Sequence, residues 1–308
     1  MEHAPGPASL AAVQVPAAGP ARARWRLVLG IFKLRIGVLI MLTALAGMAI
    51  VPHASVAPWQ VLVLALSVLV ASASAGAFNQ YVEADSDRLM ARTRQRAFAS
   101  GALQRGAGWL VLIGGMLAAA VVVAGLALNW LAALFVLSGA LTYGLLYTLV
   151  LKRRTSWNIV IGGAAGSFAA LAGSAAADPH LGPLAWLLAL VLLLWTPPHF
   201  WSLAIATREQ YAAAGVPMLP VVVGPERAAR IVFWSTVALV TVAVMPIGLS
   251  GTGWAYGVAA IAGGAHFLRK AWALAREPVR ERAMSSFFAS MVQLSVLIVG
   301  IWIDAALR

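Results

Sequence analysis

The chain has 308 residues, of which 62% are hydrophobic and only 10% are charged. Soluble domains carry roughly 25% charged residues, so a soluble protein of this composition would lack a polar surface, and the bilayer is the solvent that fits it. The absence of cysteine excludes structural disulfides, thiolate catalysis and cysteine-ligated metals. The net charge of +12 could suit nucleic acid, but the basic residues stand in short loops between apolar runs, so we expect no nucleic-acid partner.

The first twenty residues are rich in alanine, proline and glycine, and they lack the basic start and apolar core of a signal peptide. We interpret residues 1–25 as a disordered cytoplasmic tail and expect residues 26–308 to form one transmembrane domain. Nine mostly apolar runs follow, each near the length of about 20 residues that spans a bilayer. They cover residues 27–51, 60–81, 107–127, 130–150, 158–177, 184–206, 230–249, 253–272 and 285–304. The predicted fold is therefore an all-α integral membrane protein with nine transmembrane helices.

The basic residues divide unequally between the two sides of this topology. With nine spans, 21 of the 22 lysines and arginines fall on one side, and only Arg308 falls on the other. The positive-inside rule then places the N-terminus in the cytoplasm and the C-terminus outside, in a multi-pass protein of the cell inner membrane. A wrong count of spans would scramble this alternation, so the two predictions support each other.

An acidic cluster stands at the end of the second run. Glu83, Asp85 and Asp87 are three of only ten acidic residues in the chain. Asn79, Glu83 and Asp87 are spaced four apart, and because such positions drift by only about 40° around a helix, they share one stripe. Hard oxygen ligands suit Mg²⁺, which commonly also holds a substrate phosphate. The alternative is a solvated loop whose acidic and basic side chains pair with each other.

Basic residues near the acidic cluster suit the outer oxygens of a diphosphate. They directly follow the cluster and recur in the loop after the fourth run, at Arg88, Arg92, Arg94, Arg96, Lys152, Arg153 and Arg154. Three adjacent bases in the second of these loops exceed what orientation alone requires. Together with the acidic stripe they predict a metal–diphosphate site at the membrane surface, since ionisable residues at membrane depth are usually functional.

The sixth run ends in a Pro197-Pro198 pair followed by His199. Prolines inside an apolar helix break its hydrogen-bond ladder, and in membranes such breaks are tolerated where they line a cavity. His199 is compatible both with a packed interfacial histidine and with a ligand. A charged segment with Arg208, Glu209 and Tyr211 follows it.

Several segments of the chain resemble the UbiA-type intramembrane prenyltransferases, in the form found in the protoheme IX farnesyltransferases, or heme O synthases. The similar segments are residues 78–101, 147–166, 195–201 and 215–222, and the resemblance covers about residues 27–304. It implies nine helices around a central cavity. It also implies Mg²⁺ as cofactor, farnesyl diphosphate and heme b as substrates, heme O for heme-copper oxidases as product, and heme A synthase or oxidase assembly factors as partners.

The resemblance also assigns roles to residues. Asn79, Glu83 and Asp87 would be catalytic and would bind metal, with Glu209 as a further metal ligand. The substrate-binding residues would be Lys33, Arg35, Arg88, Arg92, Arg96, Lys152, Arg153, Arg154, His199, Arg208 and Tyr211. Candidate heme contacts beside His199 are Trp195 and Trp201.

The chain departs from the usual motifs at a few positions. Glu83 stands where aspartate is usual and retains the charge, whereas Gln210 replaces the usual aspartate of the second motif. A second metal site would therefore rely on Glu209 or on basic residues alone. Ala97 and Leu34 replace prolines. The alternatives to heme farnesylation are a UbiA-type enzyme with an aromatic acceptor, such as a quinone precursor or chlorophyll, and a transporter or lipid-binding protein.

Overall fold

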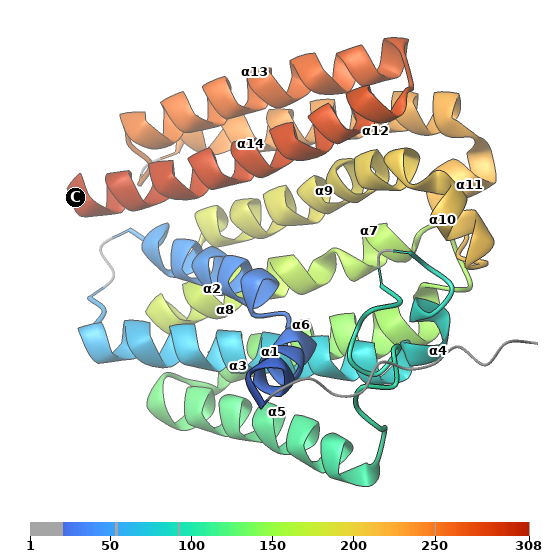
Figure 1. Ribbon diagram of the computed structural model, residues 1–308. Helices are drawn as coiled ribbons and strands as arrows, with labels where there is room; N and C mark the ends of the chain where they lie inside the picture. Colours follow the sequence, from blue (N-terminus) through green and yellow to red (C-terminus); the bar gives the residue numbers. More distant parts are fainter. Residues whose placement is uncertain (1–20, 53–54, 92, 250, 308) are drawn as a thin grey trace, which may run out of the picture.

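The structure is a computed structural model, and it describes residues 21–52, 55–91, 93–249 and 251–307 (Figure 1). Within these ranges the chain is all-helical and contains no strand. The predicted tail lies outside the described residues up to position 20, and a helix already begins at Ala21. The helices are α1 Ala21–Ile31, α2 Leu34–Ala49, α3 Pro58–Val82, α4 Ala84–Asp87, α5 Ala107–Ala127, α6 Trp130–Leu141, η1 Thr142–Leu151, α7 Asn158–Gly162, α8 Ala164–Ala177, α9 Pro183–Ala206, α10 Arg208–Ala213, α11 Leu219–Val223, α12 Pro225–Val244, η2 Met245–Gly248, α13 Trp254–Arg276 and α14 Arg280–Leu307.

The described part of the chain has seven helices long and apolar enough to cross a membrane, and an eighth if the bent pair formed by α1 and α2 counts as one span. The predicted span over residues 253–272 corresponds to α13, which is 23 residues long but is not apolar enough to count among these helices. Alanine and glycine dominate α13, and Arg269 and Lys270 enter its last third, so its mean hydropathy is low. The transmembrane all-α fold is confirmed, and the count of nine stays a prediction.

The helices pack around two large apolar clusters and two smaller ones. The largest joins α9, α12, α13 and α14, and the second joins α2, α3, α6 and α8. Between α2 and α8 the backbones touch, because a Cβ on Gly47 would overlap the carbonyl group of Ala170 and a Cβ on Gly173 would overlap that of Ala44. Small residues that permit such close approach are typical of helix contacts in membranes. Large apolar side chains such as Val111 and Leu126 point outward, as lipid-facing residues do.

Polar structure gathers at the two ends of the bundle. The short helices α4, α10 and α11 lie at one end, and the C-terminus lies at the other (Figure 1). Near the C-terminus the buried Asp304 accepts hydrogen bonds from the backbone N–H groups of Gly253 at 2.6 Å and of Ala255 and Tyr256 at 3.1 Å each. This carboxylate caps the first turn of α13, so its burial has a structural reason.

Candidate active site

We define Asn79, Glu83 and Asp87 as the acidic stripe. The stripe continues across the junction between α3 and α4. The Glu83 N–H donates to the Asn79 carbonyl at 3.0 Å, and the Asp87 N–H donates to the Glu83 carbonyl at 2.8 Å. These bonds keep the four-residue spacing of a helix through the break, so the three side chains stay on one face. All three are buried, with exposed fractions of 2%, 4% and 3%.

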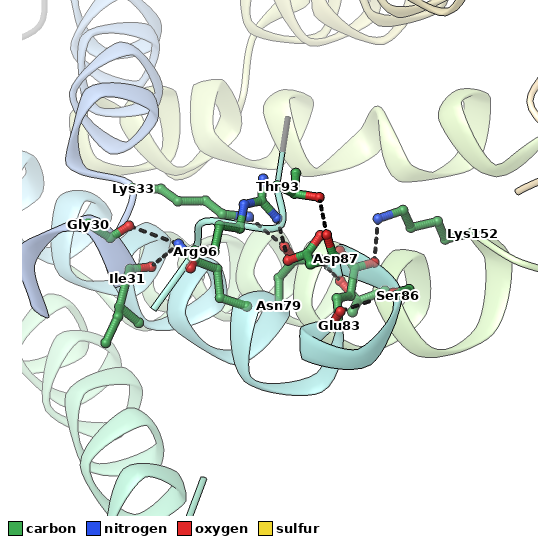
Figure 2. Close-up of polar contacts among 12 residues, drawn as sticks. Gly30, Ile31, Lys33, Asn79, Glu83, Ser86, Asp87, Thr93, Arg96 and Lys152 are labelled. Carbon is green, nitrogen blue, oxygen red and sulfur yellow. Dashed lines mark hydrogen bonds and ion pairs between the residues drawn. The ribbon is translucent and has the colours of Figure 1, made fainter. Parts of the chain in front are cut away.

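Each member of the acidic stripe contacts one basic side chain (Figure 2). Lys33 and Arg96 approach from one side and Lys152 from the other. Lys33 Nζ donates to Asn79 Oδ1 at 2.5 Å, and Lys152 Nζ donates to Glu83 Oε1 at 2.5 Å. Arg96 pairs with Asp87 Oδ2 at 2.8 Å. The structure thus brings together six residues that the sequence assigned to one site.

Lys33 reaches the stripe from a strained position. It lies between α1 and α2, where the two helices meet at 43°, and its φ of 49° and ψ of 41° place it in the left-handed region. A non-glycine residue pays a conformational cost there, and such residues concentrate at functional sites. Its Nζ also donates to the Tyr143 hydroxyl at 3.1 Å. The bend between α1 and α2 therefore aims a positive charge at the stripe.

A π-helix forms the opposite wall of the site. Residues Thr142–Leu151 adopt this rare form, and the Lys152 N–H continues it by donating to the Tyr147 carbonyl at 2.9 Å. Thr148 Oγ1 accepts a hydrogen bond from Asn79 Nδ2 at 3.0 Å and donates to the Tyr143 carbonyl at 2.8 Å. Neither Tyr143 nor Thr148 was among the residues predicted for the site, although hydroxyl groups in an apolar run are a signal for such a role.

The segment after α4 folds back over the stripe. Thr93 Oγ1 donates to the Asp87 carbonyl at 3.0 Å, and Arg88 Nε donates to the Ala99 carbonyl at 2.8 Å. The Phe98 ring packs edge-on against Tyr81. These contacts hold Arg96 beside Asp87. Arg92, also predicted to bind substrate, lies outside the described residues.

Asp85 behaves differently from its two neighbours in the acidic cluster. Its side chain is 64% exposed and pairs with Arg105 at 3.1 Å and with Arg88 at 3.8 Å. The alternative of a solvated, self-paired loop therefore describes Asp85. Glu83 and Asp87 also pair with bases, but they do so out of water, where a charge without a partner is costly.

The remaining predicted residues fall into two groups. Arg35, Arg153, Arg154, Arg208 and Glu209 are exposed. Tyr211, in contrast, is buried, and the neighbouring Gln210 has a buried Oε1 atom for which no hydrogen-bond partner is found among the described residues. No hydrogen bond or ion pair within the described chain joins Glu209 to the acidic stripe.

His199 lies in α9, away from the charged cluster in sequence. Its ring stacks between Trp195, at 4.1 Å between centroids, and Phe287 of α14, at 4.5 Å. Its Nδ1 contacts Ser290 Oγ at 2.7 Å, and Trp195 Nε1 donates to the Ser290 carbonyl at 2.9 Å. We call these four residues the histidine contact. Trp201, the other predicted heme contact, is buried, with an Nε1 atom that lacks a partner among the described residues.

The chemistry of the acidic stripe fits a hard divalent cation. Asn79, Glu83 and Asp87 offer one amide and two carboxylate groups, and oxygen atoms of this kind bind Mg²⁺. In the described chain these oxygens contact bases, and no cluster of three or more histidine, aspartate or glutamate side chains is arranged around a metal. A metal ion bound there would compete with Lys152 and Arg96 for the carboxylates, and a diphosphate would give both bases a new anionic partner.

The chain is similar in sequence to known prenyltransferases. A model of the UbiA prenyltransferase family matches residues 40–293. The chain is 49% identical to protoheme IX farnesyltransferase 2 of Paramagnetospirillum magneticum, over 92% of this chain and 99% of that protein. It is 42% identical to the protoheme IX farnesyltransferase of Gloeobacter violaceus, over 89% of this chain and 90% of that protein.

Solved structures share the fold at low sequence identity. A digeranylgeranylglyceryl phosphate synthase superposes with a TM-score of 0.77 at 18% identity, covering 93% of this chain and 100% of that chain. A UbiA homolog from Archaeoglobus fulgidus, bound to DMAPP and Mg²⁺, gives a TM-score of 0.63 at 16% identity, covering 87% of this chain and 98% of that chain. The helical bundle, the matched family model and the high identity to several relatives together establish that this chain belongs to the UbiA prenyltransferase family.

Proposed function

We propose that this prenyltransferase transfers the farnesyl group of farnesyl diphosphate to a vinyl group of heme b, with addition of water, giving heme O and diphosphate. The main support for farnesyl diphosphate as the donor is the buried acidic stripe, each member of which contacts one basic side chain. The names of the two relatives described above support heme b as the acceptor. An aromatic acceptor, as in other UbiA-type enzymes, finds no support among these relatives.

The acidic stripe and its bases would share the work of binding the donor. Asn79, Glu83 and Asp87 would hold Mg²⁺, which when bound neutralises charge on the departing diphosphate. Lys152 and Arg96, released from Glu83 and Asp87, would contact the diphosphate oxygens, and the strained Lys33 would do so beside Tyr143. We assign further basic residues to substrate binding, namely Arg35, Arg88, Arg92, Arg153, Arg154 and Arg208. Glu209 is the one carboxylate in the second motif that could serve a second metal.

The apolar part of the bundle would protect the reaction. Loss of diphosphate leaves an allylic cation on the farnesyl chain, and water must be kept from it until the vinyl group has attacked. The attack forms a carbon–carbon bond and moves the positive charge to the carbon next to the porphyrin ring. One water then adds there and releases a proton, which leaves a hydroxyethylfarnesyl substituent. Tyr211 and the histidine contact are the residues that we place on the acceptor side.

Product analysis tests this function directly. Membranes from cells that lack heme O synthase and express this chain should gain a heme heavier than heme b by one farnesyl group and one water. The same cells carrying an empty vector are the control. If heme b stays unmodified while a phenolic acceptor is prenylated, the heme assignment is wrong and the wider prenyltransferase function survives.

We further propose that the protein lies in the cell inner membrane with its N-terminus inside and its C-terminus outside. The unequal division of basic residues supports this orientation. A C-terminal reporter active only in the cytoplasm should be silent, and an active one would contradict the topology. In that membrane the product would pass to heme A synthase or to oxidase assembly factors.

A further inference from the structure

The imidazole of His199 is held rigidly by its surroundings. Trp195 and Phe287 stack on its two faces at interplanar angles of 18° and 27°, and Phe200 meets it edge-on at 88°. Only 9% of the residue is exposed. It lies seven residues before the end of α9, or about 10 Å along the helix axis, at the end of the bundle that carries α4 and α10. The acidic stripe lies at the same end.

The hydrogen bonds of Ser290 determine the tautomer of this imidazole. A serine hydroxyl has a single proton to donate. Ser290 Oγ donates it to the Phe287 carbonyl at 2.6 Å, so the 2.7 Å contact with His199 Nδ1 is donated by the imidazole. A neutral imidazole protonated on Nδ1 carries its lone pair on Nε2. A hydrogen bond from the second ring nitrogen is the arrangement that orients histidines for metal binding.

Nothing in the described part of the chain occupies Nε2. The hydrogen bond found for His199 involves Nδ1 only, and Nε2 is not among the fully buried atoms that lack a partner. The lone pair on Nε2 therefore has no partner within the described residues and is not fully sealed from solvent. A bare metal ion would need several protein ligands, and no cluster of three or more histidine, aspartate or glutamate side chains suited to a metal exists among the described residues. A metalloporphyrin needs only one, because its macrocycle supplies four nitrogens.

We infer that His199 Nε2 is an axial ligand to the iron of the metalloporphyrin acceptor, and that Ser290 acts as a positioning residue that holds the imidazole in the required tautomer. This inference rests on the proposed function, since it specifies how that acceptor is held. Binding through the iron anchors the macrocycle without using the vinyl group that must react. Tight binding of the acceptor therefore requires the iron.

Titration with two porphyrins tests the inference. The purified full-length protein in detergent is titrated with hemin and, separately, with iron-free protoporphyrin IX, and binding is followed by absorbance. His199→Ala should weaken hemin binding about 100-fold and should remove the spectral signature of an imidazole-ligated iron, while protoporphyrin IX binds as in the wild type. Unchanged protoporphyrin binding shows that the variant is folded. Added imidazole should restore the ligated spectrum.

Two serines on α14 provide a matched pair. Ser290→Ala should weaken hemin binding about 10-fold, because the imidazole loses the acceptor that fixes its tautomer. Ser286→Ala is the control, since Ser286 is equally buried but contacts Ser202, at 3.0 Å, instead of His199. It should leave hemin binding unchanged. Equal losses in the two serine variants would overturn the positioning role.

The outcomes separate this inference from the proposed function. If wild-type protein farnesylates heme b but His199→Ala binds hemin as tightly as the wild type, the axial ligand is wrong and the function stands. If His199→Ala weakens both porphyrins equally, His199 contributes shape and not ligation, and the inference is again overturned. If the wild type neither binds hemin nor farnesylates it, the proposed function fails, and the inference fails with it.

Discussion

The acidic stripe and the histidine contact are both buried, but they are built from opposite chemistry. The stripe is ionic, and its three basic partners come from the α1–α2 junction, the segment after α4 and the end of η1. The histidine contact is uncharged, and it joins only α9 and α14 through stacked rings and hydrogen bonds. A buried charged cluster must be neutralised, so the Mg²⁺–diphosphate that we propose would exchange partners with it on binding. The neutral contact has no such need and can be preformed.

The largest effect is expected at Asp87. Asp87→Ala should lower the rate of farnesyl transfer by about 10² to 10³-fold, because one electrostatic group that acts on the leaving diphosphate is lost. The measurement is heme O formed per unit time in membranes with matched protein levels. Glu83→Asp should be mild, since the carboxylate remains. Asp85→Ala is the control, because Asp85 is exposed and pairs outside the stripe. Full activity in Asp87→Ala would remove the stripe from the mechanism.

The next effect concerns stability and contrasts the ionic cluster with the neutral one. Lys152→Met should destabilise the ligand-free protein by about 3 kcal/mol, because it leaves the Glu83 carboxylate buried without a counter-charge. The Glu83 side chain is 5% exposed and that of Lys152 is 17% exposed. The double variant Lys152→Met with Glu83→Gln should recover much of the loss. Thermal unfolding in detergent measures both, and equal midpoints for the single variant and the wild type would show that the pair is dispensable.

Arg96 tests whether bases and metal compete for the stripe. Arg96→Gln should strengthen binding of Mn²⁺, used alone as a spectroscopic substitute for Mg²⁺, because Asp87 loses its internal partner. The same change should weaken binding of metal-bound farnesyl diphosphate about 10-fold, through loss of a charge-assisted hydrogen bond. Titration by electron paramagnetic resonance gives the first affinity. Arg105→Gln, which alters an exposed pair, is the control. If Mn²⁺ alone binds Arg96→Gln no better than the wild type, the partner exchange does not occur.

The smallest effect is expected when the hydrogen bond between Ser290 and His199 is removed, because no charge is lost. Ser290→Ala should lower the free energy of unfolding by about 1 kcal/mol, the usual net value of a neutral hydrogen bond. The stacked rings on His199 remain in place, so the effect should be smaller than that of Lys152→Met. Unfolding curves measured under identical detergent conditions provide the comparison. A larger loss in Ser290→Ala would reverse the contrast between the two regions.

The sequence by itself determined the features that depend on neighbours along the chain. Asn79, Glu83 and Asp87 share a face because they are four residues apart on a helix, and that geometry needs no tertiary contact. Membrane insertion follows from composition, since apolar runs of this length have no other stable environment. The family resemblance lay in the same local segments and was confirmed.

Only the tertiary structure decided which distant residues meet. Lys33 is 46 residues from Asn79, Lys152 is 69 from Glu83, and Ser290 is 91 from His199. Helical periodicity carries no information over such separations, because partners are chosen by how whole helices pack. The same holds for the π-helix that aims Lys152 inward and for the left-handed residue at Lys33, since the surrounding packing maintains both against local preference.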